Sequence, residues 1–85
     1  MSKFYYTYGT DPRYPYQGGW TEIEALDRPG ADKLFQMYHP DRTPGILNCA
    51  DIYNEDEFRR TGMDEDNFGA CCHEKITIKG RGLCC

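Results

Sequence analysis

Apolar and polar residues alternate in two short segments near the amino terminus, a pattern typical of β-strands with two different faces. Residues 3–8 are dominated by β-preferring aromatic rings and are predicted to form the first strand. Residues 20–26 alternate apolar with acidic side chains and are predicted to form the second. Between them, the glycines, prolines and tyrosines of residues 9–19 predict a loop or a wide hairpin.

A helical period replaces this alternation after the second strand. Asp27 is a typical N-cap, and Pro29 is tolerated in a first turn, where its missing N–H would be unpaired anyway. An apolar stripe with the spacing i, i+3, i+4, i+7 follows. It consists of Ala31, Leu34, Phe35 and Tyr38. Pro40 is expected to end this helix near His39.

The second half of the chain predicts shorter elements. They are a strand at residues 46–53, a short helix at 54–60 anchored by Phe58, an acidic loop at 61–69, a last strand at 70–79 and a flexible tail at 80–85. The resulting order, ββαβαβ, predicts a single α+β domain over residues 1–79. We expect a four-stranded, mostly antiparallel sheet with one main helix packed on one face.

The composition is typical of one small soluble domain. The chain has 85 residues, of which 28% are charged and 14% aromatic, whereas disordered chains are poor in rings. Its first residues contain no apolar signal-peptide core, and no run approaches the roughly 20 apolar residues that span a bilayer. We therefore expect a cytoplasmic protein without membrane contact, whose thiols stay reduced.

The negative net charge argues against nucleic acid as a direct partner and favours a basic protein. The net charge is −4, whereas direct nucleic-acid binding needs Lys and Arg to replace counterions on phosphate. Acidic residues also concentrate between residues 51 and 66, which would attract a bacterial protein with a basic surface. Such runs are also common as merely solvated surface. The acids predicted to contact a partner are Glu55, Asp56, Glu57, Asp64, Glu65 and Asp66.

Aromatic rings cluster between residues 4 and 20 and fall on both faces of the first predicted strand. One core side cannot absorb all of them, so we expect Trp20, Tyr14 and Tyr16 to be exposed anchors of a protein interface. Two other uses stay open: packing within the sheet, and stacking on a nucleotide base. The cations available for a nucleotide's phosphate would be Lys3, Arg13, Arg28 and Arg42.

Five cysteines in so short a chain are its sharpest chemical feature. Four of them form adjacent pairs, Cys71-Cys72 and Cys84-Cys85. Because the count is odd and the compartment is expected to be reducing, they are predicted to be free thiols or metal ligands rather than bridges.

Strand alternation predicts different roles for two neighbouring cysteines. Cys72 should face the core with Ile76, whereas Cys71 should lie beside His73. A structural zinc site would then use Cys49, Cys71 and His73, with a further ligand from the terminal pair, although the spacing of strong zinc motifs is missing. Cys71 and His73 could also form a nucleophilic pair, but so small a sheet offers little pocket, and we do not expect an enzyme.

Several segments together carry a resemblance. They are GGWTEIEA at residues 18–25, LFQMYHP at 34–40, LNCA at 47–50, Phe58, NFGA at 67–70 and CHE at 72–74. Taken together they resemble small proteins of Firmicutes phages and mobile elements. The resemblance implies no activity and no site residues.

These observations favour a non-enzymatic phage or mobile-element accessory protein that binds a macromolecular partner. By size and charge it resembles inhibitors of bacterial defence systems, including the anti-CRISPR class, with an acidic face that mimics nucleic acid. Two alternatives stay open. One is a binder of a small molecule or signalling nucleotide, and the other is a small structural zinc module. No cofactor other than zinc is expected.

Overall fold

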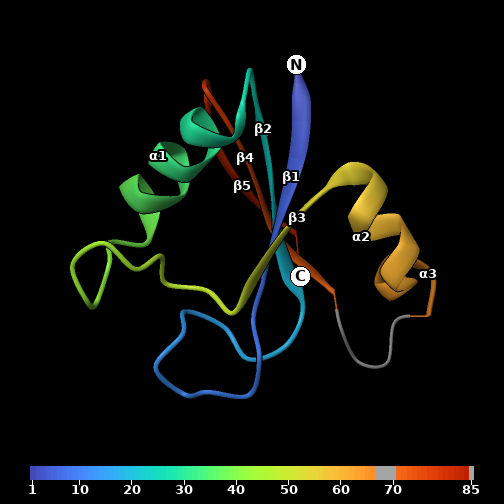
Figure 1. The fold of residues 1–85 in the computed structure, drawn as a ribbon, viewed down its shortest axis with the longest axis horizontal. Coiled ribbons are helices and arrows are strands. Elements are labelled where there is room, and N and C mark those ends of the chain that lie inside the picture. Colours follow the sequence, from blue (N-terminus) through green and yellow to red (C-terminus); the bar gives the residue numbers. More distant parts are fainter. Residues whose placement is uncertain (67–70, 85) are drawn as a thin grey trace.

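The structure, a computed structural model, describes residues 1–66 and 71–84. Within these ranges a five-stranded mixed sheet carries helices on both faces (Figure 1). The strands are β1 (Ser2–Thr7), β2 (Trp20–Ala25), β3 (Asp51–Asn54), β4 (Cys72–Thr77) and β5 (Gly80–Leu83). The helices are α1 (Arg28–Tyr38), α2 (Glu55–Thr61) and α3 (Met63–Asp66).

The strand order is β3-β1-β2-β4-β5. β1 pairs antiparallel with both β2 and β3, β4 pairs antiparallel with β5, and β2 pairs parallel with β4. The predicted α+β class is therefore confirmed, whereas the predicted four-stranded sheet is wrong. The fifth strand forms from residues predicted as a flexible tail, because Gly80 (φ 144°) permits the tight turn that folds them back on β4.

Two other predicted boundaries differ from the structure. The strand expected at 46–53 is confined to β3, because Thr43 and Ile46 close a turn on each other. Within the loop expected at 61–69, Met63–Asp66 form the short helix α3. The strand expected at 70–79 is present as the shorter strand β4. Residues 67–70 and Cys85 lie outside the described part of the chain.

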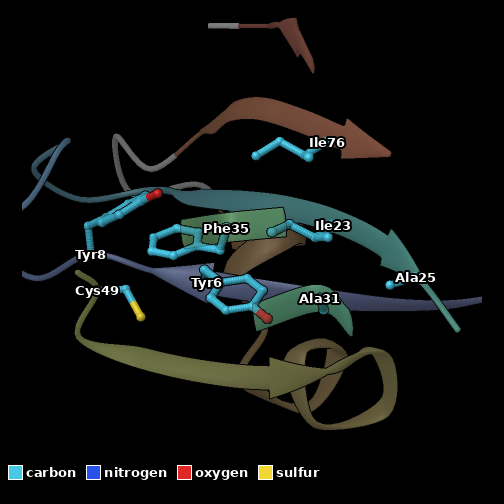
Figure 2. Packing of buried hydrophobic residues seen from close by; sticks show 8 residues of the cluster. All are labelled: Tyr6, Tyr8, Ile23, Ala25, Ala31, Phe35, Cys49 and Ile76. Carbon is cyan, nitrogen blue, oxygen red and sulfur yellow. The ribbon is translucent and has the colours of Figure 1, made fainter. Parts of the chain in front are cut away.

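α1 forms as its sequence predicts and covers one face of the sheet. The Asp27 side chain accepts a hydrogen bond from the Gly30 N–H at 2.9 Å, and the helix is capped at its other end by His39. Ala31 and Phe35 are fully buried. The Phe35 ring stacks on Tyr6, with the ring centroids 4.6 Å apart. Figure 2 shows this main core, which consists of Tyr6, Tyr8, Ile23, Ala25, Ala31, Phe35, Cys49 and Ile76.

α2 covers the opposite face with a smaller core. Asn54 and Glu57 form a capping box at its start, as the sequence allows, and Gly62 ends it in the left-handed conformation. Phe58 is 2% exposed and stacks on Tyr5, with the ring centroids 4.1 Å apart. Because helices cover both faces, rings on both faces of β1 are buried.

One extra residue breaks the register between β2 and β4. Trp20 lies opposite Cys72 and Thr21 lies opposite Glu74, so His73 forms a β-bulge with no partner of its own in β2. Consequently Cys72 packs against the α2-side cluster, whereas the next residues turn toward α1. The prediction that Cys72 shares a core face with Ile76 is therefore wrong, because strict alternation does not continue through a bulge.

Gly19 makes room for this bulge, because it has no side chain to meet His73. Alanine substitutions test this close packing. A Cβ on Gly19 would overlap the carbonyl oxygen of Cys71 and the Nε2 atom of His73, whereas a Cβ on Gly18 would meet nothing within 4 Å. Both glycines have positive φ (69° and 72°), so alanine at either should cost about 1–2 kcal/mol of stability.

Gly19→Ala should lose a further amount of about 1–3 kcal/mol, the usual cost of overpacking, while Gly18→Ala serves as the matched control. Urea unfolding of both variants measures the difference. Equal losses would mean that the backbone at Gly19 is not packed against the bulge.

Candidate functional site

A buried carboxylate lies at the centre of the polar residues on the α1 side. Glu74 is 0% exposed and accepts a hydrogen bond from the Thr21 hydroxyl at 2.8 Å. A second, short hydrogen bond joins it to His39 Nε2 at the end of α1. The Arg81 guanidinium on β5 lies 3.6 Å away, and the Tyr8 hydroxyl contacts Thr21 in turn. The carboxylate therefore ties together α1, β2, β4 and β5.

Two opposing effects set the charge of this carboxylate. Burial alone would raise the pKa of Glu74, but the hydrogen bonds from His39 and Thr21 and the charge of Arg81 outweigh it and lower that pKa below its ordinary value. Glu74 is therefore ionised at neutral pH. Since its oxygens are occupied by protein donors and it has no solvent exposure, we assign the group a structural role.

The bulge residue packs against the long loop between β1 and β2. The imidazole of His73 stacks on the Tyr16 ring, with centroids 4.3 Å apart, and its Nε2–H donates to the Gly18 carbonyl at 2.8 Å. Tyr14 and Tyr16 are both half-buried and pack against the main core. The exposure predicted for these two tyrosines is therefore only partial.

Trp20 was predicted to be exposed, and that prediction is wrong. It is 8% exposed and its ring lies edge-on to Phe58 at 5.0 Å between centroids. With one covered face this ring would lie exposed, but α2 covers the second face of the sheet. The surplus of ring surface on which exposed aromatic anchors depended is therefore absorbed by the smaller core.

The predicted acids lie on two consecutive helices. Glu55, Asp56 and Glu57 occupy the first turn of α2, and Asp64 and Glu65 lie on α3. Arg59 contacts two of them, Glu55 at 3.1 Å and Asp64 at 4.0 Å, and so reduces the local negative charge. The carboxyl group of Asp66 lies outside what the structure describes.

The cysteines divide between the core and one end of the sheet. Cys49 is buried in the main core, where burial raises its pKa to about 12. Cys72 and Cys84 carry free thiols, whereas Cys71 is disulfide-bonded, so the prediction of free thiols or metal ligands is wrong for Cys71.

Over residues 1–66 and 71–84, no three His, Cys, Asp or Glu side chains gather closely enough to hold a metal ion. The structure therefore does not bring the predicted zinc ligands Cys49, Cys71 and His73 together.

An apolar groove that the sequence did not predict lies where β2 ends and α1 begins. It has a volume of about 270 Å³ and is lined by Met1, Leu26, Leu34 and Ile78, among others. Three of these side chains are exposed to an unusual degree: Met1 to 70%, Leu26 to 81% and Ile78 to 75%. Leu26 and Ile78 each directly follow the last residue of a strand. Large apolar residues just after two strands were therefore the signal in the sequence for this groove.

A second concavity, the arginine concavity, has a volume of about 440 Å³ and contains Arg13, Tyr14 and Arg42 in its lining. The Arg13 guanidinium forms a forked ion pair with Asp11, with one N–O distance of 2.8 Å, which lowers the pKa of Asp11 to about 2. Arg42 donates to the Arg13 carbonyl at 3.3 Å. Two arginines and one tyrosine therefore line the same concavity.

Comparisons with known proteins place the chain in no group. No protein family matches it, and neither does any curated protein or any solved structure. In the described ranges, each helix is too short or too polar to span a bilayer.

The buried carboxylate gives a test by pH. Glu74→Gln keeps the side-chain shape but removes the charge, so it should destabilise the protein at pH 7 by about 1.5–3 kcal/mol, the usual range for hydrogen bonds to charged groups. The pKa of Glu74 is lowered in the fold. Its contribution is therefore fully present above the unfolded value of about 4.3 and is lost as pH falls through the folded pKa.

The difference between wild type and Glu74→Gln in urea unfolding should accordingly shrink toward pH 3. Exposed Glu65→Gln is the control and should match wild type at both pH values. A difference that stays constant with pH would show that the Glu74 charge is not the stabilising group.

Proposed function

We propose that the protein is a non-enzymatic binder of a protein partner and that the apolar groove is its principal contact. The observation that carries this proposal is the gathering of Met1, Leu26 and Ile78, each at least 70% exposed, around one groove. Clustered exposed apolar side chains are typical of interaction surfaces, whereas isolated ones are common anywhere.

Burial of these three side chains in a complex would supply a large part of the binding free energy. Fully burying one large apolar side chain is worth about 1.5–3 kcal/mol. Burying three of them would therefore offset a large part of the entropic cost of association, which is about 4–15 kcal/mol. Neighbouring charged groups would have to supply part of the remainder.

Acids of α2 continue this surface. Met1 also lines a hollow of about 310 Å³ that contains Lys3, Glu55 and Asp56. Glu24 and Asp27 lie at the groove itself, together with Lys33. Acids outnumber lysines along this path, so the best-fitting partner presents an apolar segment beside basic residues.

This chemistry also suggests the class of partner. Enzymes that bind nucleic acid carry basic grooves, and an acidic surface can occupy such a groove in place of phosphates. Together with the resemblance to phage and mobile-element proteins, this supports inhibition of a bacterial defence nuclease as the specific form of the proposal.

Groove variants test the proposal. Leu26→Asp and Ile78→Asp should each weaken partner binding at least tenfold, because they place a charge where apolar surface is buried. Met37→Asp is the matched control, since Met37 is 71% exposed and is not a groove residue.

The measurement is quantitative affinity capture from the natural host, followed by titration of the captured protein. A protein held by wild type and by Met37→Asp but lost by both groove variants supports the proposal. Equal binding to all four proteins rules out the groove.

The arginine concavity favours a second candidate, binding of a nucleotide or another small anion. Of the cations expected for this role, Arg13 and Arg42 line one concavity together with Tyr14, whereas Arg28 pairs with Asp32 on α1. An aromatic ring beside two guanidinium groups suits a base and its phosphate. The ion pair between Arg13 and Asp11 weakens the attraction and makes this the second choice.

Thermal unfolding with AMP, GMP and cyclic di-AMP tests this candidate. A nucleotide at 100 times its dissociation constant should stabilise the protein by about 2.7 kcal/mol. Arg13→Ala and Arg42→Ala should abolish the shift, while Arg60→Ala, on the exposed side of α2, should retain it. Identical melting of wild type with and without millimolar nucleotide would exclude the candidate.

A further inference from the structure

The bulge at His73 brings two free thiols to the same face of the sheet. Because His73 is the extra residue, Cys72 lies on the α2 side, in contact with the cluster of Trp20 and Phe58. On β5, Gly82 pairs with Lys75, which lines the same hollow as Cys72. Side chains two residues apart on a strand share a face, so Cys84 also points to the α2 side.

Backbone pairing brings the two cysteines to neighbouring positions. The Cys84 N–H donates to the His73 carbonyl at 3.0 Å, which continues the antiparallel ladder of β4 and β5 by one residue and places Cys84 opposite His73, the residue next to Cys72. The side chains of Cys72 and Cys84 are in hydrogen-bonding contact. Two thiols in such contact meet the first requirement of a disulfide, which is that the two side chains approach each other.

The surroundings of the two thiols differ. Cys84 is exposed, whereas Cys72 is half-buried. Burial, and after it the neighbouring Cys84 thiol, raise the pKa of the Cys72 thiol to about 11, as expected for two sulfurs in close contact. An exposed thiol that can react first therefore lies beside a sheltered one that can react second.

We propose that Cys72 and Cys84 form a redox-active dithiol that reacts with low-molecular-weight disulfides such as oxidised glutathione. The Cys84 thiolate attacks one sulfur of the reagent, which forms a mixed disulfide and releases one glutathione thiolate. The Cys72 thiolate then attacks the Cys84 sulfur and releases the second glutathione. Two protein thiols are oxidised to one Cys72–Cys84 bond, and one glutathione disulfide is reduced to two glutathione molecules.

Trp20 provides a built-in reporter of this reaction. It is the chain's single tryptophan, lies opposite Cys72 and belongs to the cluster that Cys72 contacts. A disulfide in contact with an indole ring quenches its fluorescence. Formation of the Cys72–Cys84 bond should therefore dim the emission of the folded protein.

The test is a redox titration of the full chain. Protein fully reduced with dithiothreitol is transferred to buffers of increasing oxidised glutathione, and Trp20 emission is followed. Free thiols are then trapped by alkylation, and tandem mass spectrometry locates the link. Besides re-forming the disulfide of Cys71, wild type should lose two further free thiols together with its emission, and this second link should join Cys72 to Cys84.

Variants separate this reaction from unspecific oxidation. Cys84→Ser changes an exposed residue, keeps the fold and should abolish both the link and the loss of emission. Cys49→Ser, in the separate main core, should respond as wild type does. A link that joins Cys72 or Cys84 to any cysteine other than each other, or an unchanged response of Cys84→Ser, would overturn the proposal.

Discussion

The insertion of His73 into the pairing of β2 with β4 determines which side chain faces which core. With the extra residue, Glu74 reaches His39 and Thr21 on the α1 side, while Cys72 packs against the Trp20 cluster on the α2 side. The bulge needs space, which Gly19 supplies because it has no Cβ to meet His73. The polar network and the position of the thiol pair both follow from this local geometry.

Local elements were predictable because their signals lie within a few residues of each other. The apolar stripe and the Asp27 cap specify α1, and the Asn54 capping box specifies α2 around Phe58. Pairing between distant segments leaves no such signal. The parallel β2–β4 pair, the bulge and the Gly-rich edge strand β5 depend on backbone hydrogen bonds that side-chain periodicity does not encode.

The surface available for binding differs from the predicted one for the same reason. Aromatic rings were predicted at the surface because only one face of the sheet was expected to be covered by a helix. Phe58 brings α2 onto the other face and buries Tyr5 and Trp20. A cluster of exposed apolar side chains lies instead just after two strands, at Leu26 and Ile78. Glu55–Glu57 lie in the first turn of a short helix as predicted, whereas Asp64 and Glu65 were expected in a loop and lie on α3, and Arg59 offsets part of this charge.

Nuclear Overhauser contacts between β2 and β4 test the register break most directly. The structure predicts contacts that pair Trp20 with Cys72 and Thr21 with Glu74, so that His73 has no partner in β2. A continuous ladder in which Thr21 pairs with His73 would contradict this account. In such a ladder Cys72 and Glu74 would share one face, so they could not pack on opposite sides of the sheet as described.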